Sequence, residues 1–208
     1  MVSLKLPDCK QLAWEVLGFH RDTLYVATLG PGAVARERFR TEGRTGCMSW
    51  SWSPWWSPNS EMVAVPLMYL GNHVHGRSSG DQPETPGTYV VPASEGKAEW
   101  LINGSTVYER VISSAAVYES GHWSPDSRYW AQEVWEWGRQ LPQCVVGEVA
   151  TGKSWVVSGT EPGMQPAWAP DSKRLVFVRL IPTGKYRTYD LELWTVKVDG
   201  TGLRRLVK

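Results

Sequence analysis

One short signature occurs four times along the 208-residue chain, and it consists of a large apolar residue, a proline, an Asp or Asn, and a Ser or Cys. The four copies are Leu6-Pro7-Asp8-Cys9, Trp56-Ser57-Pro58-Asn59-Ser60, Trp123-Ser124-Pro125-Asp126-Ser127 and Trp168-Ala169-Pro170-Asp171-Ser172. Successive prolines lie 51, 67 and 45 residues apart. Periods near this length are typical of solenoids, propellers and other arrays. The repeat therefore constrains the architecture, although it names no reaction.

Each signature is predicted to be a hairpin turn. Proline suits the second position of a type I turn, and Asp or Asn suits the third. Ser57 and Ser124 stand at the first position, where a hydroxyl can accept a local hydrogen bond. The large apolar residue before the turn would close a buried strand.

Three more strands are predicted after each turn. The second strands cover residues 12–17, 62–67, 129–134 and 175–180. The third strands cover residues 24–29, 88–91, 143–149 and 191–198, and the fourth cover 36–40, 98–102, 154–157 and 203–207. A glycine turn joins the third strand to the fourth. Apolar residues fall on both faces of these strands, as in sheets that are covered on both sides.

The position six residues after each proline is small, with Val176 as the largest member; it holds Ala13, Ala64, Ala131 and Val176. A recurring small residue at one depth indicates crowding between packed sheets. Four antiparallel strands with two apolar faces form a β-propeller blade. The sequence therefore predicts an all-β, single-domain propeller over residues 1–208, with blades of about 1–46, 47–103, 119–158 and 163–208.

The last repeat resembles the TolB-type (WD-repeat-like) β-propeller repeat, whose blade reads roughly W-S-P-D-G-K-x-I-A-F, D-I-Y-V-x-D-x-D-G-x-G and R-R-L-T. The matching residues run from Trp168 to Val178, from Asp190 to Val198 and from Asp199 to Leu206. The third repeat matches well at its turn and loosely afterwards, and the first and second match at the turn and in the third strand. Serine or cysteine stands where that family has glycine after the aspartate.

Propellers of this type usually have six or more blades, so the resemblance implies at least six. The chain has only four repeats. We therefore expect a partial propeller or one completed by oligomerisation or by parent-chain blades, in preference to a closed four-bladed ring. In that arrangement each terminal blade exposes one apolar face. We expect these faces to include Leu12, Trp14 and Val16 at one end and Leu175, Phe177 and Leu193 at the other.

Charge and hydropathy exclude some partners. The chain has 22 Lys and Arg against 21 Asp and Glu, so its net charge is +1 and no global field recruits nucleic acid. No apolar run approaches the roughly 18 residues of a spanning helix. The first residues lack the apolar core of a signal peptide. The family resemblance is consistent with a place outside the cytoplasm.

The three cysteines, Cys9, Cys47 and Cys144, have no metal-binding spacing. Cys9 and Cys47 could form a disulfide in an oxidising compartment, and the other interpretation is three unpaired, mostly buried thiols. We expect no metal and no cofactor.

Two letter-for-letter motif matches are rejected on structural context. Residues 147–154 fit the phosphate-loop pattern, but a strand is predicted to follow them where nucleotide binding needs a helix. Residues 76–80 fit the nucleophile-elbow pattern, but no apolar strand leads into them.

Histidines are the remaining candidates for chemistry. His73 and His75 would share one face of a strand and could hold a metal there, and the alternative is that both are solvated loop residues. His122 precedes Trp123 and could line a central channel or be a hydrogen-bonded structural residue.

Binding on a propeller is carried by loops that a rigid scaffold holds in place. In an antiparallel meander the signature turns and the glycine turns share one rim, so the long connections, such as 71–87, 136–142 and 181–189, share the other. We expect this long-loop rim to bind. Its candidate ligand-binding residues are His73, His75, Trp135, Trp137, Arg139, Tyr186 and Arg187.

The sequence thus predicts a non-catalytic propeller domain that recognises a protein, peptide or glycan. The alternative is a propeller enzyme, or the accessory or gating propeller of a larger peptidase or polysaccharide lyase.

Overall fold

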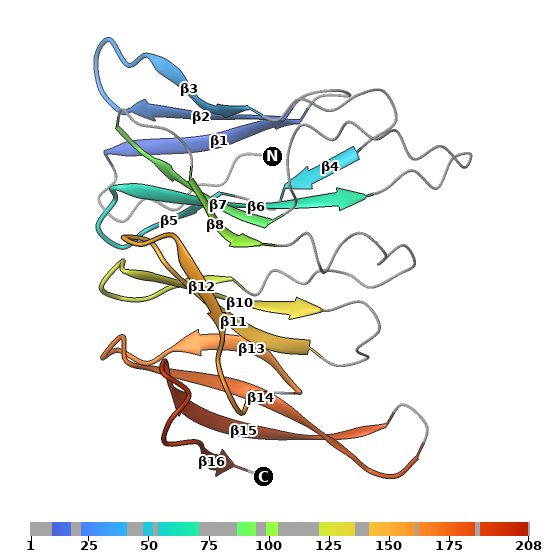
Figure 1. Cartoon of the computed structure of the whole chain (residues 1–208). Helices are drawn as coiled ribbons and strands as arrows, with labels where there is room; N and C mark the ends of the chain where they lie inside the picture. Colours follow the sequence, from blue (N-terminus) through green and yellow to red (C-terminus); the bar gives the residue numbers. More distant parts are fainter. Residues whose placement is uncertain are drawn as a thin grey trace, which may run out of the picture. The chain divides into compact units, whose positions relative to one another are not determined.

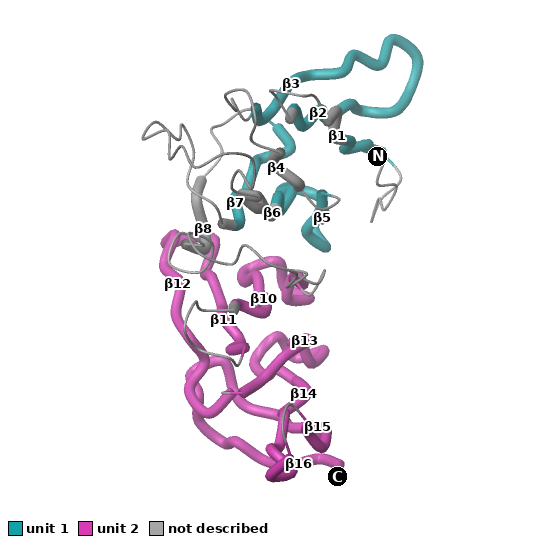
Figure 2. Tube along the Cα trace, turned by 90° about the vertical axis from the view of Figure 1, so that its right-hand side faces the viewer, with its two compact units in different colours: residues 1–115 teal, residues 116–208 magenta. Residues whose placement is uncertain are grey.

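The structure is a computed structural model of the chain, and it describes residues 10–17, 22–40, 48–51, 54–70, 87–94, 99–103, 121–135, 142–160, 162–185 and 188–207. Within these ranges the chain forms strands and turns and no helix, which confirms the all-β prediction. The chain divides into two compact units, Met1–Ala115 and Ala116–Lys208 (Figure 2). The assignment of residues 1–208 to a single domain stays a prediction.

The first unit holds two antiparallel sheets (Figure 1). Sheet 1 consists of β1 (Gln11–Leu17), β2 (Asp22–Thr28) and β3 (Ala35–Arg40), in that order. Sheet 2 consists of β4 (Met48–Ser51), β5 (Trp55–Trp56), β6 (Met62–Leu70), β7 (Gly87–Pro92) and β8 (Glu99–Asn103), and both β4 and β5 pair with β6. The expected first strand of sheet 1, residues 1–6, lies outside the described residues.

The second unit also holds two antiparallel sheets. Sheet 3 consists of β9 (His122–Trp123), β10 (Tyr129–Trp135), β11 (Pro142–Glu148) and β12 (Lys153–Val156). Sheet 4 consists of β13 (Gly163–Trp168), β14 (Arg174–Pro182), β15 (Tyr189–Lys197) and β16 (Arg204–Val207). Each of the four sheets falls within one of the four expected repeats.

The connection between β14 and β15 is shorter than the sequence indicated. The two strands pair along their whole length, from Arg174 opposite Lys197 to Pro182 opposite Tyr189. The backbone N–H of Thr183 then donates to the carbonyl of Thr188 at 3.2 Å. The strands therefore continue beyond the ends expected from the sequence, by Ile181 and Pro182 in β14 and by Tyr189 and Asp190 in β15.

The core of the first unit lies between its two sheets. Sheet 1 contributes Ala13, Leu24 and Val26, and sheet 2 contributes Trp56, Val63, Val65 and Val91, none of them more than 8% exposed. Phe39 and Tyr89 extend this core with ring centroids 5.1 Å apart.

The core of the second unit lies between sheets 3 and 4 and is fully buried. Its members are Ala131, Cys144, Val146, Val157, Leu175, Phe177 and Val196. The expectation that Leu175 and Phe177 lie on an exposed terminal face is therefore wrong. These positions, five and seven residues after the signature proline, point toward the preceding sheet, whereas the small position six residues after it points the opposite way. The side chain of Val16 lies outside the described part of the chain.

The three signature copies that the structure describes form the hairpin turn that their residues predict, and the copy at residues 6–9 lies outside the described residues. In sheet 3 the Ser124 hydroxyl donates to the Asp126 carboxylate at 2.6 Å and accepts from the Tyr129 N–H at 2.9 Å. Ser57 makes the same two contacts in sheet 2, to Asn59 at 2.7 Å and from Met62 at 3.0 Å. The serine hydroxyl is thus the local acceptor that the sequence indicated.

The phosphate-loop match at residues 147–154 lies on the hairpin between β11 and β12. A strand follows the loop, as predicted, so there is no helix N-terminus in this hairpin to hold a phosphate. The nucleophile-elbow match at residues 76–80 lies outside the described residues. A search of the described residues for a helix long and apolar enough to span a membrane finds none.

Candidate functional site

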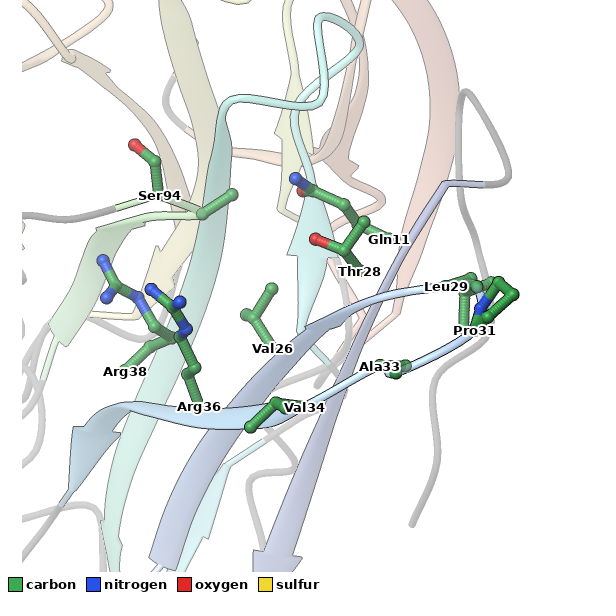
Figure 3. Close-up of a pocket in the computed structure, with 13 residues that line it drawn as sticks. Gln11, Val26, Thr28, Leu29, Pro31, Ala33, Val34, Arg36, Arg38 and Ser94 are labelled. Carbon is green, nitrogen blue, oxygen red and sulfur yellow. The ribbon is translucent and has the colours of Figure 1, made fainter.

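A cavity of about 460 Å³ opens in the first unit, where the glycine turn between β2 and β3 meets the end of β7 (Figure 3). Its polar lining comes from β1, β2, β3 and the residues that follow β7. The lining includes Gln11, Val26, Thr28, Arg36, Arg38 and Ser94.

Strand pairing puts these side chains on one face of sheet 1. Gln11 pairs with Thr28, and Val26 pairs with Arg36. Directly paired residues share a face of a sheet, and so do residues two apart along one strand. Figure 3 shows Arg36 and Arg38 on one side of Val26, with Gln11 and Thr28 on the other. This is the face of sheet 1 that carries Val26 and packs against sheet 2.

Arg38 lies at a bulge in β3. Leu24 pairs with Phe39 and Tyr25 pairs with Glu37, so Arg38 is the extra residue between them. Alternation along β3 places Arg38 on the same face as Arg36, and the bulge brings Phe39 onto that face as well. The Nε and Nη2 atoms of Arg38 donate to the Pro92 carbonyl oxygen at 3.3 and 3.1 Å. Sheet 2 therefore holds the guanidinium in place at the cavity wall.

The local charge is positive. Strand β3 reads ARERFR, and its single acid, Glu37, pairs with Arg40 at 2.6 Å. The lining residues that the structure describes include no Asp, Glu, His or Cys. An anionic group in this cavity would therefore lie near arginine side chains, and the described lining residues include no carboxylate. The described part of the wall has groups that can bind and orient a ligand.

The opposite wall carries an unmet acceptor. The Oε1 atom of Gln11 is buried and accepts no hydrogen bond from any residue of the described ranges. A buried polar atom without a partner costs roughly 1–3 kcal/mol. A ligand N–H or O–H placed beside Gln11 would supply the missing donor. The cavity thus offers donors at Arg38 and an acceptor at Gln11.

The structure does not test the site residues expected from the sequence. His73, His75, Trp137, Arg139, Tyr186 and Arg187 fall outside the described residues. Trp135 ends β10 opposite Pro142, and its side chain is not described. The long-loop rim therefore stays a prediction.

His122 and Cys144 take part in the packing of the second unit. The carbonyl oxygen of His122 accepts the Trp168 indole N–H at 2.9 Å, and burial lowers the pKa of the imidazole. Cys144 is a free thiol with 0% exposure, and burial raises its pKa to about 12. Within the described residues no group of three or more His, Cys, Asp or Glu could hold a metal ion. Cys9 and Cys47 lie outside the described residues, so their pairing stays open.

The cavity lined by Arg36 and Arg38, the arginine cavity, was not predicted from the sequence, because no binding was assigned to the rim of short turns. A signal was present in the alternation of arginines after a Gly-Pro-Gly turn. That alternation places Arg36 and Arg38 on one face, but the backbone carbonyl of Pro92 that holds Arg38 leaves no mark in the residue pattern.

Solved structures share this arrangement of sheets. Oligogalacturonate lyase from Vibrio parahaemolyticus superposes with a TM-score of 0.58 at 13% identity, over 97% of this chain and 51% of the lyase. The fold is a β-propeller. TolB from Acinetobacter baumannii gives a TM-score of 0.51 at 14% identity, over 97% of this chain and 41% of TolB. The tricorn protease gives 0.58 at 13% identity, over 91% of this chain and 17% of the protease.

These similarities establish the fold alone. The chain spans about half the length of the lyase and less than half that of the A. baumannii TolB. No protein-family model matches the sequence, and no curated protein matches it at a significant level. The TolB-type resemblance of the repeats is thus supported at the level of the propeller fold.

Proposed function

We propose that this chain is a non-catalytic β-propeller binding domain that recognises a carboxylate group on a protein, peptide or glycan. The observation that carries the proposal is the arginine cavity of the first unit. Arg38 is held there by the Pro92 carbonyl before any ligand arrives. A side chain that is already in position loses little conformational entropy on binding.

The chemistry of the wall favours a carboxylate. A guanidinium carries five N–H donors in a planar fork, and the Pro92 carbonyl engages two of its three nitrogens. A carboxylate can accept from the remaining nitrogen, and such charge-assisted bonds are about twice as strong as neutral ones. Gln11 and Thr28 would then contact a hydroxyl or amide of the same ligand. Acidic sugars and acidic peptides both carry that combination.

The long-loop rim is proposed as a second contact surface. Its candidates are the seven residues named from the sequence: His73, His75, Trp135, Trp137, Arg139, Tyr186 and Arg187. Substituting Trp137 or Arg139 is expected to weaken binding of a large partner while leaving the melting temperature unchanged. Unfolding of these variants would instead assign the residues to the core.

Isothermal titration tests the cavity with two probes, trigalacturonate as an acidic glycan and a short Asp-Glu peptide. The fully methyl-esterified trigalacturonate is the ligand control, because it keeps the sugar and lacks the charge. Arg38→Gln is expected to lower affinity by about tenfold or more, since a hydrogen bond to a charged group contributes roughly 1.5–3 kcal/mol.

Arg40→Gln is the matched protein control, because it removes the same charge from the same strand outside the cavity lining. It is expected to change affinity little. An equal loss of affinity in the two variants would show that the effect comes from general electrostatics and not from the cavity. Failure of both probes to bind would contradict the carboxylate site. The probe that binds decides between glycan and peptide.

The enzyme alternative has a direct readout. A lyase cleaves a uronate chain by elimination and leaves an unsaturated sugar that absorbs ultraviolet light. We expect no such product from oligogalacturonate, with or without added Mn²⁺. If the product forms and is lost in His73→Ala or His75→Ala, the chain is a metal-assisted enzyme and not a non-catalytic binding domain.

A further inference from the structure

The arginine cavity has a cationic end and an aliphatic end. The cationic end carries Arg36 and Arg38. The aliphatic end is the turn between β2 and β3, whose side chains in the lining are those of Leu29, Pro31, Ala33 and Val34. Figure 3 shows Val34 between Arg36 and Ala33, so the two ends meet at Val34. A ligand that fills the cavity therefore needs an anionic group beside an apolar one.

The aliphatic end can bury part of a ligand. Leu29 is 46% exposed and Val34 is 67% exposed. Covering such side chains with an apolar group is favourable in proportion to the area that is removed from water. Val26 and Ala93 extend the aliphatic wall inward, because Val26 belongs to the core of the first unit and Ala93 packs against that core. The cavity can therefore bind an aliphatic side chain as well as a charge.

The guanidinium of Arg38 keeps a pair of donors for the charge. Its Nε and Nη2 atoms donate to the Pro92 carbonyl oxygen at 3.3 and 3.1 Å. A guanidinium has five N–H groups, so two on Nη1 and one on Nη2 remain. Neighbouring N–H groups of Nη1 and Nη2 match the two oxygens of a carboxylate in a bidentate pair. A carboxylate can therefore bind Arg38 without displacing the Pro92 carbonyl.

Building on the function proposed above, we propose that the ligand of this cavity is the carboxyl terminus of a peptide or protein whose last residue is aliphatic, such as leucine or valine. In a terminal residue the carboxylate and the side chain are attached to one carbon atom. The carboxylate can then bind Arg38 while the side chain packs on Val34. The hydroxyls of Thr28 and Ser94, which also line the cavity, can donate to or accept from the last peptide group.

The other carboxylate ligands fit this lining less well. A uronate carries hydroxyls on its ring carbons, and hydroxyls that are buried against aliphatic side chains lose their hydrogen bonds to water. An internal Asp or Glu brings backbone into the cavity on both sides of its side chain, whereas a terminus brings backbone on one side. The volume of about 460 Å³ is near the small end of ligand pockets, which span roughly 300–1,000 Å³. Its size therefore favours the end of a chain.

Isothermal titration of the full chain with four acetylated tetrapeptides tests the proposal. The reference peptide is Ala-Ala-Ala-Leu with a free carboxylate. The same sequence with a terminal amide should bind about tenfold more weakly or worse, since it lacks the charge-assisted bonds. Ala-Ala-Ala-Ser with a free carboxylate should bind about tenfold more weakly, since it lacks the aliphatic side chain. Ala-Glu-Ala-Leu with a terminal amide should bind no better than the first amide.

Variants of the protein separate the two ends of the cavity. Arg38→Gln should reduce the preference for the carboxylate over the amide, and Arg40→Gln, outside the cavity lining, should keep it. Val34→Ser should reduce only the preference for leucine over serine, and the fold should survive because Val34 is 67% exposed. Val207→Ser changes a valine that is 58% exposed outside the cavity lining, so this control should keep both preferences.

The possible results distinguish the chain terminus from other carboxylates. Equal affinity for the leucine acid and its amide, or for the leucine and serine acids, would overturn the chain terminus as the ligand. If the internal glutamate peptide or trigalacturonate binds and the leucine acid does not, the carboxylate site of the proposed function stands and only the terminus is wrong. Failure of every carboxylate probe to bind would contradict both.

Discussion

The hydroxyl of Ser172 in sheet 4 accepts a hydrogen bond from the backbone N–H of Asp126 in sheet 3 at 3.0 Å. The two residues belong to successive copies of the signature, so this hydrogen bond connects one repeat to the next. Ser172 has a φ of 56°, in the left-handed region that favours glycine. The TolB-type pattern has glycine there. Serine at this position gains a contact between sheets that offsets the strain of its backbone.

Substitution of Ser172 separates the contact from the strain. Ser172→Ala removes the acceptor and keeps the Cβ atom, and it is expected to lower the free energy of unfolding by about 1 kcal/mol. Ser172→Gly also removes the acceptor but relieves the left-handed backbone, so its loss should be smaller. Urea unfolding measures both. An alanine variant as stable as the wild type would show that the hydrogen bond contributes nothing.

The signature tryptophan is expected to matter more than the signature aspartate. Trp168 stacks on Tyr129 with ring centroids 5.8 Å apart and donates to the His122 carbonyl. Trp168→Ala should cost roughly 3–5 kcal/mol through lost packing. Asp126→Ala loses local turn contacts and should cost about 1 kcal/mol. Thermal unfolding of both variants decides, and equal small losses would contradict the core position of the tryptophan.

Gly163 has no room for a side chain. A Cβ atom there would lie 2.0 Å from the Thr160 carbonyl oxygen and 2.7 Å from Phe177. Gly163→Ala should therefore cost roughly 1–3 kcal/mol or more, because the nearer contact is backbone. Gly184→Ala is the comparison variant: no atom lies within 4 Å of the added carbon, so its cost comes only from the positive φ of 79°, which Gly163 does not have. A smaller loss at Gly163 than at Gly184 would refute the steric argument.

Cys144 should be inert in the folded protein. Burial raises its pKa to about 12 from an ordinary value of 9.0, so almost no thiolate exists near pH 8. Peptide mapping after iodoacetamide treatment is expected to find Cys144 unmodified until denaturant is added. Because the unfolded thiol loses its proton at lower pH than the folded one, this residue also makes stability fall as pH rises above about 9. Rapid labelling under native conditions would contradict its burial.

The repeat carries most of the fold in its residue pattern. The spacing from each proline predicts the strands, and Ala13, Ala64 and Ala131 are fully buried, as the recurrence of a small residue indicates. The direction of stacking is not in that pattern, because apolar residues occupy both faces. Leu175 and Phe177 were for that reason expected on an exposed face, and the structure buries them against sheet 3.

The candidate site was far less predictable. Alternation along β3 places Arg36 and Arg38 on one face, but it does not indicate that this face meets the end of β7. That meeting depends on how two sheets pack and not on the residues of either strand alone. The partner of Arg38, the Pro92 carbonyl, is a backbone atom 54 residues away, and no side-chain motif announces it.

Hydrogen–deuterium exchange of the full chain, with and without the probe that binds in titration, tests the binding account most directly. We expect slower exchange on ligand addition in the peptides that cover residues 26–38 and 92–94, which line the cavity. The same protection should be absent in Arg38→Gln at equal probe concentration. Protection confined to residues 71–87, 136–142 and 181–189 would contradict the cavity and move the site to the long-loop rim.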